Sequence, residues 1–299
     1  MSNPKRHHYL PQSYLAAWVR ADGEVTQYSR PWKDLVIKSC SPFATGFEDH
    51  LYSLHGEPDP SEREQVELKW MQRIDNDAAI VLKQLTSEPR KRLTQSQSDA
   101  WITFLTSMIF RTPARLKWMH EEIRNHDHRF SDAERHEYDR LRPTDAPATP
   151  EQYFREGGYE ELSVARMQLM LRMIQSQVIG GGLAKMIWRV HAIQRVRYGL
   201  LTGDDPVLMS NGLNADDAFV ILPVGPRHLF IAAGSERAMW SYTSQADRDI
   251  ERAINDAIVA QARVLVIGQN AKQAAFVDKR LGKNPVGDGL LGRHTWKCP

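Results

Sequence analysis

The sequence predicts an α+β protein that is dominated by helices, with a small, mostly antiparallel sheet built from its N-terminal and C-terminal segments. Short apolar runs separated by turn signals lie at both ends of the chain, at about residues 1–55 and 198–268. Between them, through residues 60–197, apolar residues recur every three or four positions, as in amphipathic helices. Each group of strands is too short to fold independently, so we expect one domain spanning residues 1–299.

The N-terminal segment predicts a short helix followed by strands. Pro11 is placed as a first-turn proline. The Ala21-Asp22-Gly23 turn precedes an alternating strand at residues 24–28. The apolar runs 35–37 and 51–54 predict two further strands.

Two capping patterns predict where helices begin in the middle of the chain. Ser61 is followed by Glu64 and Thr94 by Gln97, the spacing at which a side chain at each position caps the other's backbone. The second helix should end at Arg111-Thr112-Pro113, because proline disfavours a continuous helix. A third helix should follow it.

Proline and glycine divide the rest of the chain. Three prolines and Gly157-Gly158 predict a surface connection over residues 142–158. A methionine-rich helix should follow and continue to Val190, with Gly180–Gly182 marking a break or a close backbone approach. Strands at 200–202, 219–222 and 229–231 and an amphipathic helix from Gln245 complete the prediction.

Composition narrows the class of protein. The 41% hydrophobic content is ordinary for a globular chain, and Cys40 and Cys298 match no zinc or disulfide pattern. No apolar run approaches the roughly 18 residues that cross a membrane, and residues 1–9 lack a signal-peptide core. We therefore expect a soluble cytoplasmic protein with reduced thiols and no membrane partner.

Charge is unevenly distributed, although the net charge is only +2. Residues 162–203 contain no acid but include several arginines, Arg166 among them, whereas residues 121–160 are rich in acids. A basic stretch of this kind can steer an anion toward a site. The alternative is a solvated helix face beside an acidic loop.

His7, His8 and Asp204 are the candidate catalytic residues. Adjacent histidines before an apolar helix can supply a general base or a phosphate contact. Asp204 follows an apolar strand and precedes Pro206, which would present its carboxylate to a cleft. The alternatives are a histidine that caps the helix and an ordinary Asp-Pro turn.

Arg111 and Asn255 are the candidate substrate-binding residues. Arg111 at a helix end can hold a phosphate or carboxylate with two parallel hydrogen bonds, or neutralise a buried acid. Asn255 interrupts an apolar helix face, either as a ligand group or as a satisfied core amide. The histidines at 126, 128 and 136 have no apolar frame and predict a solvated surface. No nucleotide, dinucleotide, esterase or zinc-protease motif is present.

Several short motifs resemble one family when they are taken in order. They are His7–Pro11 with Tyr14-Leu15, Arg111–Pro113, Thr202–Val207, Pro223–Pro226, Ile254-Asn255 and Ala262-Arg263. Together they are similar to the widespread microbial domain-of-unknown-function family 4238, over roughly residues 5–268. Gly203 stands where that family has serine, which argues against a serine nucleophile, and Asp205 stands for asparagine. The resemblance implies a shared site for His7, His8, Arg111 and Asp204 but brings no reaction.

Two functions follow as hypotheses. The first is a hydrolase, nuclease- or phosphatase-like, that acts on a phosphorylated small molecule or a nucleic acid in bacterial stress or defence, with a divalent metal as one candidate cofactor. The second is a non-catalytic binding module whose polar residues form a structural network. Catalytic residues should line an open cleft, whereas structural ones should be enclosed. The oligomeric state stays open.

Overall fold

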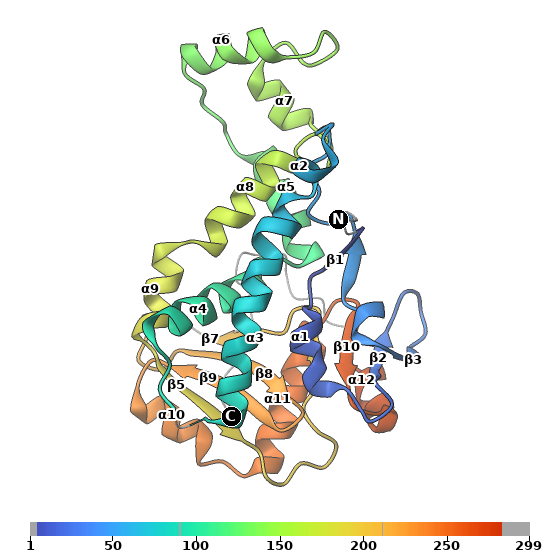
Figure 1. Ribbon diagram of the computed structural model, residues 1–299, viewed down its shortest axis with the longest axis vertical. Coiled ribbons are helices and arrows are strands. Elements are labelled where there is room, and N and C mark those ends of the chain that lie inside the picture. The colour runs from blue at the N-terminus through green and yellow to red at the C-terminus, as the bar shows by residue number, and fades with distance from the viewer. Residues whose placement is uncertain (1–4, 90, 211, 283–299) are drawn as a thin grey trace.

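The chain folds into helices packed around small antiparallel sheets, as the α+β prediction requires. The computed structural model describes residues 5–89, 91–210 and 212–282. In Figure 1 the longer sheets and the C-terminal helices occupy the lower half, and helices from the middle of the sequence rise above them. The strands of the described residues form one two-stranded and two four-stranded sheets, whose pairings are all antiparallel.

One four-stranded sheet joins the two ends of the chain. Its order is β3 (Val36–Cys40), β2 (Val25–Ser29), β10 (Leu265–Gly268) and β6 (Thr202–Gly203). Residues 265–268 of β10 pair with residues 26–29 of β2 on one side, and β6 pairs on the other. A sheet built from N-terminal and C-terminal segments is therefore confirmed. That the whole chain is one folding unit stays a prediction.

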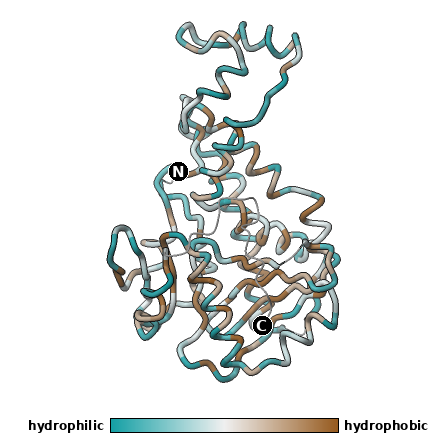
Figure 2. Tube along the Cα trace, turned by 180° about the vertical axis from the view of Figure 1, so that it is seen from behind, coloured by the Kyte–Doolittle hydropathy of each residue, from teal (hydrophilic) through white to brown (hydrophobic). Residues whose placement is uncertain are grey.

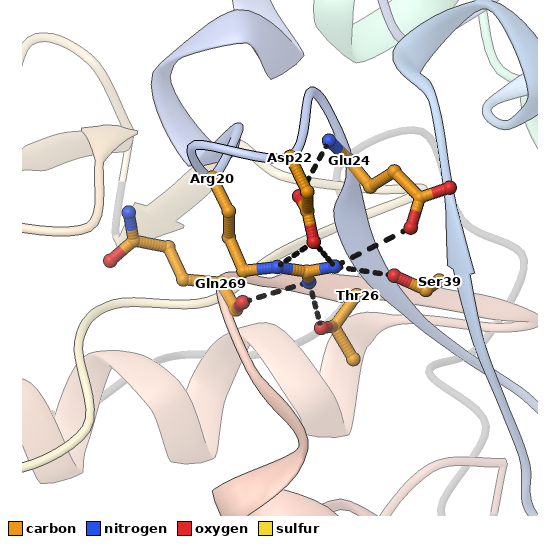
Figure 3. Close-up of polar contacts among 6 residues, drawn as sticks. All are labelled: Arg20, Asp22, Glu24, Thr26, Ser39 and Gln269. Atoms are coloured by element: carbon orange, nitrogen blue, oxygen red, sulfur yellow. Dashed lines mark hydrogen bonds and ion pairs between the residues drawn. The ribbon is translucent and has the colours of Figure 1, made fainter.

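Arg20 links the N-terminal hairpin to the end of β10 (Figure 3). Its guanidinium donates to the Thr26 hydroxyl at 2.8 Å and to the backbone oxygen of Gln269 at 3.1 Å. It also contacts Asp22 at 2.9 Å and the hydroxyl of Ser39. One side chain thus satisfies groups from β2, β3 and the segment after β10.

The other four-stranded sheet comes entirely from the second half of the chain. Its order is β5 (Ile187–Ala192), β9 (His228–Ala233), β8 (Phe219–Gly225) and β7 (Leu208–Ser210). All of β8 is buried, which explains its continuous apolar sequence. The prediction of helix at residues 187–190 was wrong. The preceding helix ends at Lys185, and the β-branched Ile187 and Val190 pair with β9 instead.

Helices cover these sheets and form the middle of the chain. They are α1 (Gln12–Leu15), α2 (Pro60–Arg63), α3 (Gln72–Ser87), α4 (Gln95–Phe110), α5 (Pro113–Asn125), α6 (Asp132–Leu141), α7 (Pro150–Glu156), α8 (Ser163–Ile174), α9 (Gln177–Lys185), α10 (Glu236–Thr243), α11 (Asp247–Gln261) and α12 (Ala274–Asp278). Figure 2 shows the most hydrophobic segments along the strands and the helices next to them. Within the part of the chain that is described, no helix is long and apolar enough to cross a bilayer.

The helix starts test the two predicted capping boxes. Thr94 and Gln97 form the predicted box at the start of α4, and α4 ends at Phe110 before Pro113 begins α5. The box at Ser61 and Glu64 was wrong. Asp59 caps α2 by accepting from the Ser61 amide, and the Glu64 side chain is buried in contacts elsewhere.

The strand predicted at residues 51–54 was also wrong. β1 (Arg6–His8) pairs with β4 (Phe47–Asp49), whereas residues 51–54 form no strand: residues 51 and 52 lie in a turn and the next two are irregular. His50 has a φ of 57°, in the left-handed region that ends an extended strand. The apolar character of Leu51 and Tyr52 reflects burial in the core rather than strand pairing.

The middle of the chain is more helical than predicted. α7 lies inside the predicted connection at residues 142–158, and α6 and α7 project away from the rest of the molecule in Figure 1. Residues 180–182 do not break a helix but lie within α9. The predicted close approach occurs at Gly182, where an added Cβ would lie 3.0 Å from the Cβ of Leu213.

Candidate functional site

His7 is enclosed in a polar cluster beside β4. Its side chain is fully buried, and its Nδ1 accepts the Tyr52 amide at 2.9 Å. That contact places the ring proton on Nε2, which donates to the Glu64 carboxylate at 3.0 Å. The Glu64 carboxylate also accepts from the Ser53 hydroxyl at 2.7 Å. Both ring nitrogens of His7 are thus engaged by the fold, and its catalytic role stays a prediction.

His8 and Arg111 belong to the same enclosed region. The His8 ring packs against Phe43 and Phe47, and burial lowers its pKa. The Arg111 side chain is fully buried, and its two terminal nitrogens bind the Asp75 carboxylate at 2.6 and 2.9 Å. One of them also donates to the backbone oxygen of His8 at 2.6 Å. The two-pronged anion contact predicted for Arg111 therefore exists, and its partner is a carboxylate of this chain.

Asn255 fastens the loop before β6 to helix α11. Its side-chain oxygen accepts the Leu201 amide at 2.8 Å, and its nitrogen donates to the oxygens of Gly199 and Gln273. One turn earlier, Glu251 accepts backbone amides of residues 197–199. The Asn255 amide is therefore satisfied inside the fold, and its role as a substrate contact stays a prediction.

Asp204 lies at the end of β6, where it holds the start of β10. Its carboxylate accepts the backbone amides of Arg263 at 2.9 Å, Val264 at 2.7 Å and Leu265 at 3.2 Å. Amide donors favour the charged form, but burial outweighs them and raises the pKa of Asp204 to about 6. Unlike His7, Asp204 also lines a cavity.

That cavity has a volume of about 1270 Å³ and lies along helix α5. We call it the α5 cavity. Its walls are one face of α5, the first residues of β4, the corner between β6 and β10, and the turn before α8. Its polar and aromatic lining residues are Tyr9, Phe47, Glu48, Thr112, Lys117, Trp118, His120, Glu121, Glu122, Tyr159, Asp204, Asp205 and Arg263. The volume is large enough for a small-molecule ligand.

Two adjacent carboxyl groups, Asp204 and Asp205, line the α5 cavity. Asp204 and Asp205 are both only 8% exposed, and burial raises the pKa of each. The Asp205 carboxylate lies 3.7 Å from the guanidinium of Arg115, a residue of α5, which moderates its shift. Tyr9 lies close enough for the charge of Asp204 to raise its pKa further. Buried carboxyls with perturbed pKa values facing a cavity are typical of acid–base sites.

His120 and Tyr159 also line the α5 cavity, and the buried Arg166 packs against Tyr159. The His120 ring lies 5.4 Å from the Tyr159 ring, and burial and the nearby Arg166 charge lower the pKa of His120. The Arg166 guanidinium stacks on the Tyr159 ring, with its central carbon 3.5 Å from the ring centre. Sequence reasoning missed His120 and Tyr159. It noted Arg166 only as part of a basic stretch, although Leu162, Arg166 and Met170 repeat at core spacing on α8.

The balance of charge in the α5 cavity limits what it can bind. Its described lining includes five carboxylate side chains but only Lys117 and Arg263 as permanent cations. Among the described residues no group of three or more His, Cys, Asp or Glu is placed to hold a metal ion. A long polyanion would meet repulsion along most of these walls.

The comparison with family models agrees with the sequence motifs. Residues 6–272 match the family described as a protein of unknown function, DUF4238. No curated protein and no solved structure matches the chain. The match includes every residue that lines the α5 cavity and the enclosed cluster around His7 and Arg111. The chain belongs to the DUF4238 family.

Proposed function

We propose that the protein is a hydrolase and that the α5 cavity is its active site. The observation that carries the proposal is the pair Asp204 and Asp205, two neighbouring buried carboxyls with raised pKa values that face one cavity. Carboxyl groups that titrate near the working pH can both donate and accept a proton. Isolated surface aspartates remain fully ionised and cannot donate one.

The chemistry requires a proton to move in each direction. The ionised carboxylate of the pair takes a proton from a water molecule, and the oxygen of that water attacks the substrate. The protonated carboxyl of the pair gives a proton to the oxygen that leaves. We assign the mobile proton to the pair, because neighbouring carboxyls titrate together. The three amides that hold Asp204 fix its orientation, and Asp205 has the less constrained carboxylate.

A phosphorylated small molecule is the substrate class that we propose. Nucleic acid, the other class expected from the sequence, is less well supported because five carboxylates line the α5 cavity. No residue described above bears on the setting in bacterial stress or defence, which stays a prediction.

A binding module is the second candidate, and a specific observation favours it. His7, Arg111 and Asn255 all have polar partners inside the described fold, although the Nε of Arg111 has no hydrogen-bond partner among the described residues. Such enclosed networks stabilise a structure without any chemistry. Under this reading the α5 cavity would bind a ligand without converting it.

Hydrolysis of phosphoester and ester model substrates, with and without a chelator, separates the two candidates. We expect wild-type activity to survive the chelator and to depend on an ionisation near pH 6. Asp205→Asn should lower kcat by about 10²- to 10⁴-fold, the usual effect of losing a general acid or base. Asp217→Asn is the matched control, because Asp217 is also the second residue of an Asp-Asp pair but is exposed.

The control variant should keep wild-type activity, and both variants should keep a cooperative melting transition. Absence of activity on every substrate from a folded wild-type protein would favour the binding module. Equal activity of Asp205→Asn and the wild type would show that Asp205 is not a general acid or base in the reaction.

A further inference from the structure

Arg166 is a buried cation that forms no ion pair with any residue the structure describes. It lies on α8, and its side chain is fully buried. One terminal nitrogen, Nη1, donates to the backbone oxygen of Tyr159, and the guanidinium stacks on the Tyr159 ring. Its Nε and Nη2 have no hydrogen-bond partner among the described residues. Arginine stays protonated in proteins, so this environment encloses a charge that the described residues do not neutralise.

The two unsatisfied donors of Arg166 lie on the same edge of the guanidinium. The N–H groups of Nε and Nη2 point in parallel, the arrangement that binds two oxygens of one carboxylate or phosphate. The remaining terminal nitrogen is already used by the Tyr159 backbone. The Tyr159 ring fixes the plane of the guanidinium from one face. The free edge is therefore oriented before any ligand binds.

His120 supplies a second unsatisfied group at the same place. Its Nδ1 is enclosed and has no hydrogen-bond partner in the described part of the chain. His120 lines the α5 cavity, and its ring contacts the Tyr159 ring that covers Arg166. The charges of Arg166 and Arg124 act against its protonation, whereas Glu121 and Glu161 act in favour of it. The negative charge of a bound anion would act in the same direction as Glu121 and Glu161. It would favour the protonated form of His120, in which Nδ1 is a donor.

We propose that Arg166 and His120 form an oxyanion subsite at one end of the α5 cavity, which binds the phosphate or carboxylate group of a small molecule. Tyr159, 39% exposed, covers the site, and its side chain must shift to admit the anion. The preceding Gly157-Gly158 pair gives that turn a flexible backbone. The proposal rests on the α5 cavity as the active site and names the substrate's anionic group. The rest of the substrate would then reach toward Asp204 and Asp205.

Binding of inorganic phosphate and of acetate to the full chain tests the subsite and separates the two anions. We expect one or both to raise the Tm of the wild-type protein, because a ligand that binds only the folded state stabilises it. Arg166→Met should weaken that binding at least tenfold. Arg172→Met is the matched control, since Arg172 lies on the same helix but is exposed, and it should bind as the wild type does.

The His120 ring gives a readout that needs no variant at residue 166. Titration by NMR should show the pKa of His120 rising when phosphate or acetate is present, and no such rise in Arg166→Lys, which keeps the charge but loses the parallel donors. If Arg166→Met does not fold, this titration decides. Equal binding by Arg166→Met and the wild type, or a His120 pKa that neither anion changes, would overturn the subsite.

The same experiments distinguish this proposal from the hydrolase. Asp205→Asn should still bind the anion, because the Asp205 carboxylate lies beside Arg115 and is not part of the proposed subsite. Anion binding without hydrolysis would support the oxyanion subsite and contradict the hydrolase proposal. Hydrolysis together with anion binding that does not depend on Arg166 would contradict the subsite and support the hydrolase.

Discussion

Arg111 and Arg166 are both fully buried, yet they lie in opposite chemical situations. Arg111 places its two terminal nitrogens on Asp75 and also reaches the backbone of His8. Among the described residues, the Arg166 guanidinium contacts the backbone oxygen and the ring of Tyr159 and no carboxylate. The Arg111 region is closed over by His7, Tyr52 and the surrounding core, whereas the Arg166 region borders the α5 cavity through His120 and Tyr159.

The difference teaches how to separate a structural charge from one placed for a ligand. A buried arginine that has its own carboxylate serves the fold, because desolvation of both ions is repaid by their contact. A buried arginine that lacks one is retained against its effect on stability. Sequence alone made Arg111 the anion contact, because its helix-end position was visible. The partners that decide between the two arginines are far apart in sequence.

The largest expected effect is a loss of stability when Arg111 loses the charge of its partner Asp75. Asp75→Asn removes the charge that neutralises Arg111 and leaves a buried cation, so we expect the free energy of unfolding to fall by about 3–5 kcal/mol. Urea unfolding measures it. Asp77→Asn, two residues along the same helix and exposed, should change it by less than about 0.5 kcal/mol. A loss at Asp75 as small as that at Asp77 would mean that the Arg111 pair contributes little to the fold.

The pH dependence of Asp204 gives a smaller effect. Its pKa is raised from 3.8 to about 6 in the folded protein. A raised carboxyl pKa means that the folded state holds the proton more tightly, so this contribution to stability is present below about pH 4 and is lost as the pH rises through about 6. The shift of about two units corresponds to roughly 3 kcal/mol.

Unfolding of the wild type and of Asp204→Asn between pH 4 and pH 7 measures this contribution. The stability of the wild type relative to the variant should fall as the pH rises. A relative stability that rises with pH instead would show that the three amide donors outweigh burial. Asp204 would then serve as a fixed anion that holds β10, not as an acid.

Local chemistry made part of this fold predictable. The capping box at Thr94 uses residues three positions apart, and β8 has a continuous apolar run, so neighbours in the sequence suffice for both. Residues 187–190 were read as helix because β9, the strand that pairs with them, is about 40 residues away. His50 ends β4 through a left-handed backbone conformation that no local pattern indicated.

The candidate site was less predictable than the fold, for the same physical reason. Of the residues predicted to form a site, Asp204 lines the α5 cavity, whereas His7 and Arg111 lie in the enclosed cluster. His120 looked like one more polar residue of a surface helix. Burial and the absence or presence of a distant partner determine which polar groups remain available, and a single sequence does not contain either quantity.

The smallest expected effect is a difference in stability between variants of two tyrosines, Tyr52 beside Arg111 and Tyr159 beside Arg166. The Tyr52 hydroxyl donates to the backbone oxygen of Arg111 at 2.8 Å inside the enclosed cluster, so Tyr52→Phe should lower the free energy of unfolding by about 1 kcal/mol, the net value of a typical buried hydrogen bond. Tyr159→Phe keeps the ring that stacks on Arg166 and removes a hydroxyl of a partly exposed residue, so its stability should stay within about 0.5 kcal/mol of the wild type. Thermal and urea unfolding of the two variants measure both values. Equal losses would mean that the Arg111 and Arg166 regions are equally closed, and the distinction between a structural arginine and a ligand-binding one would then fail at these two residues.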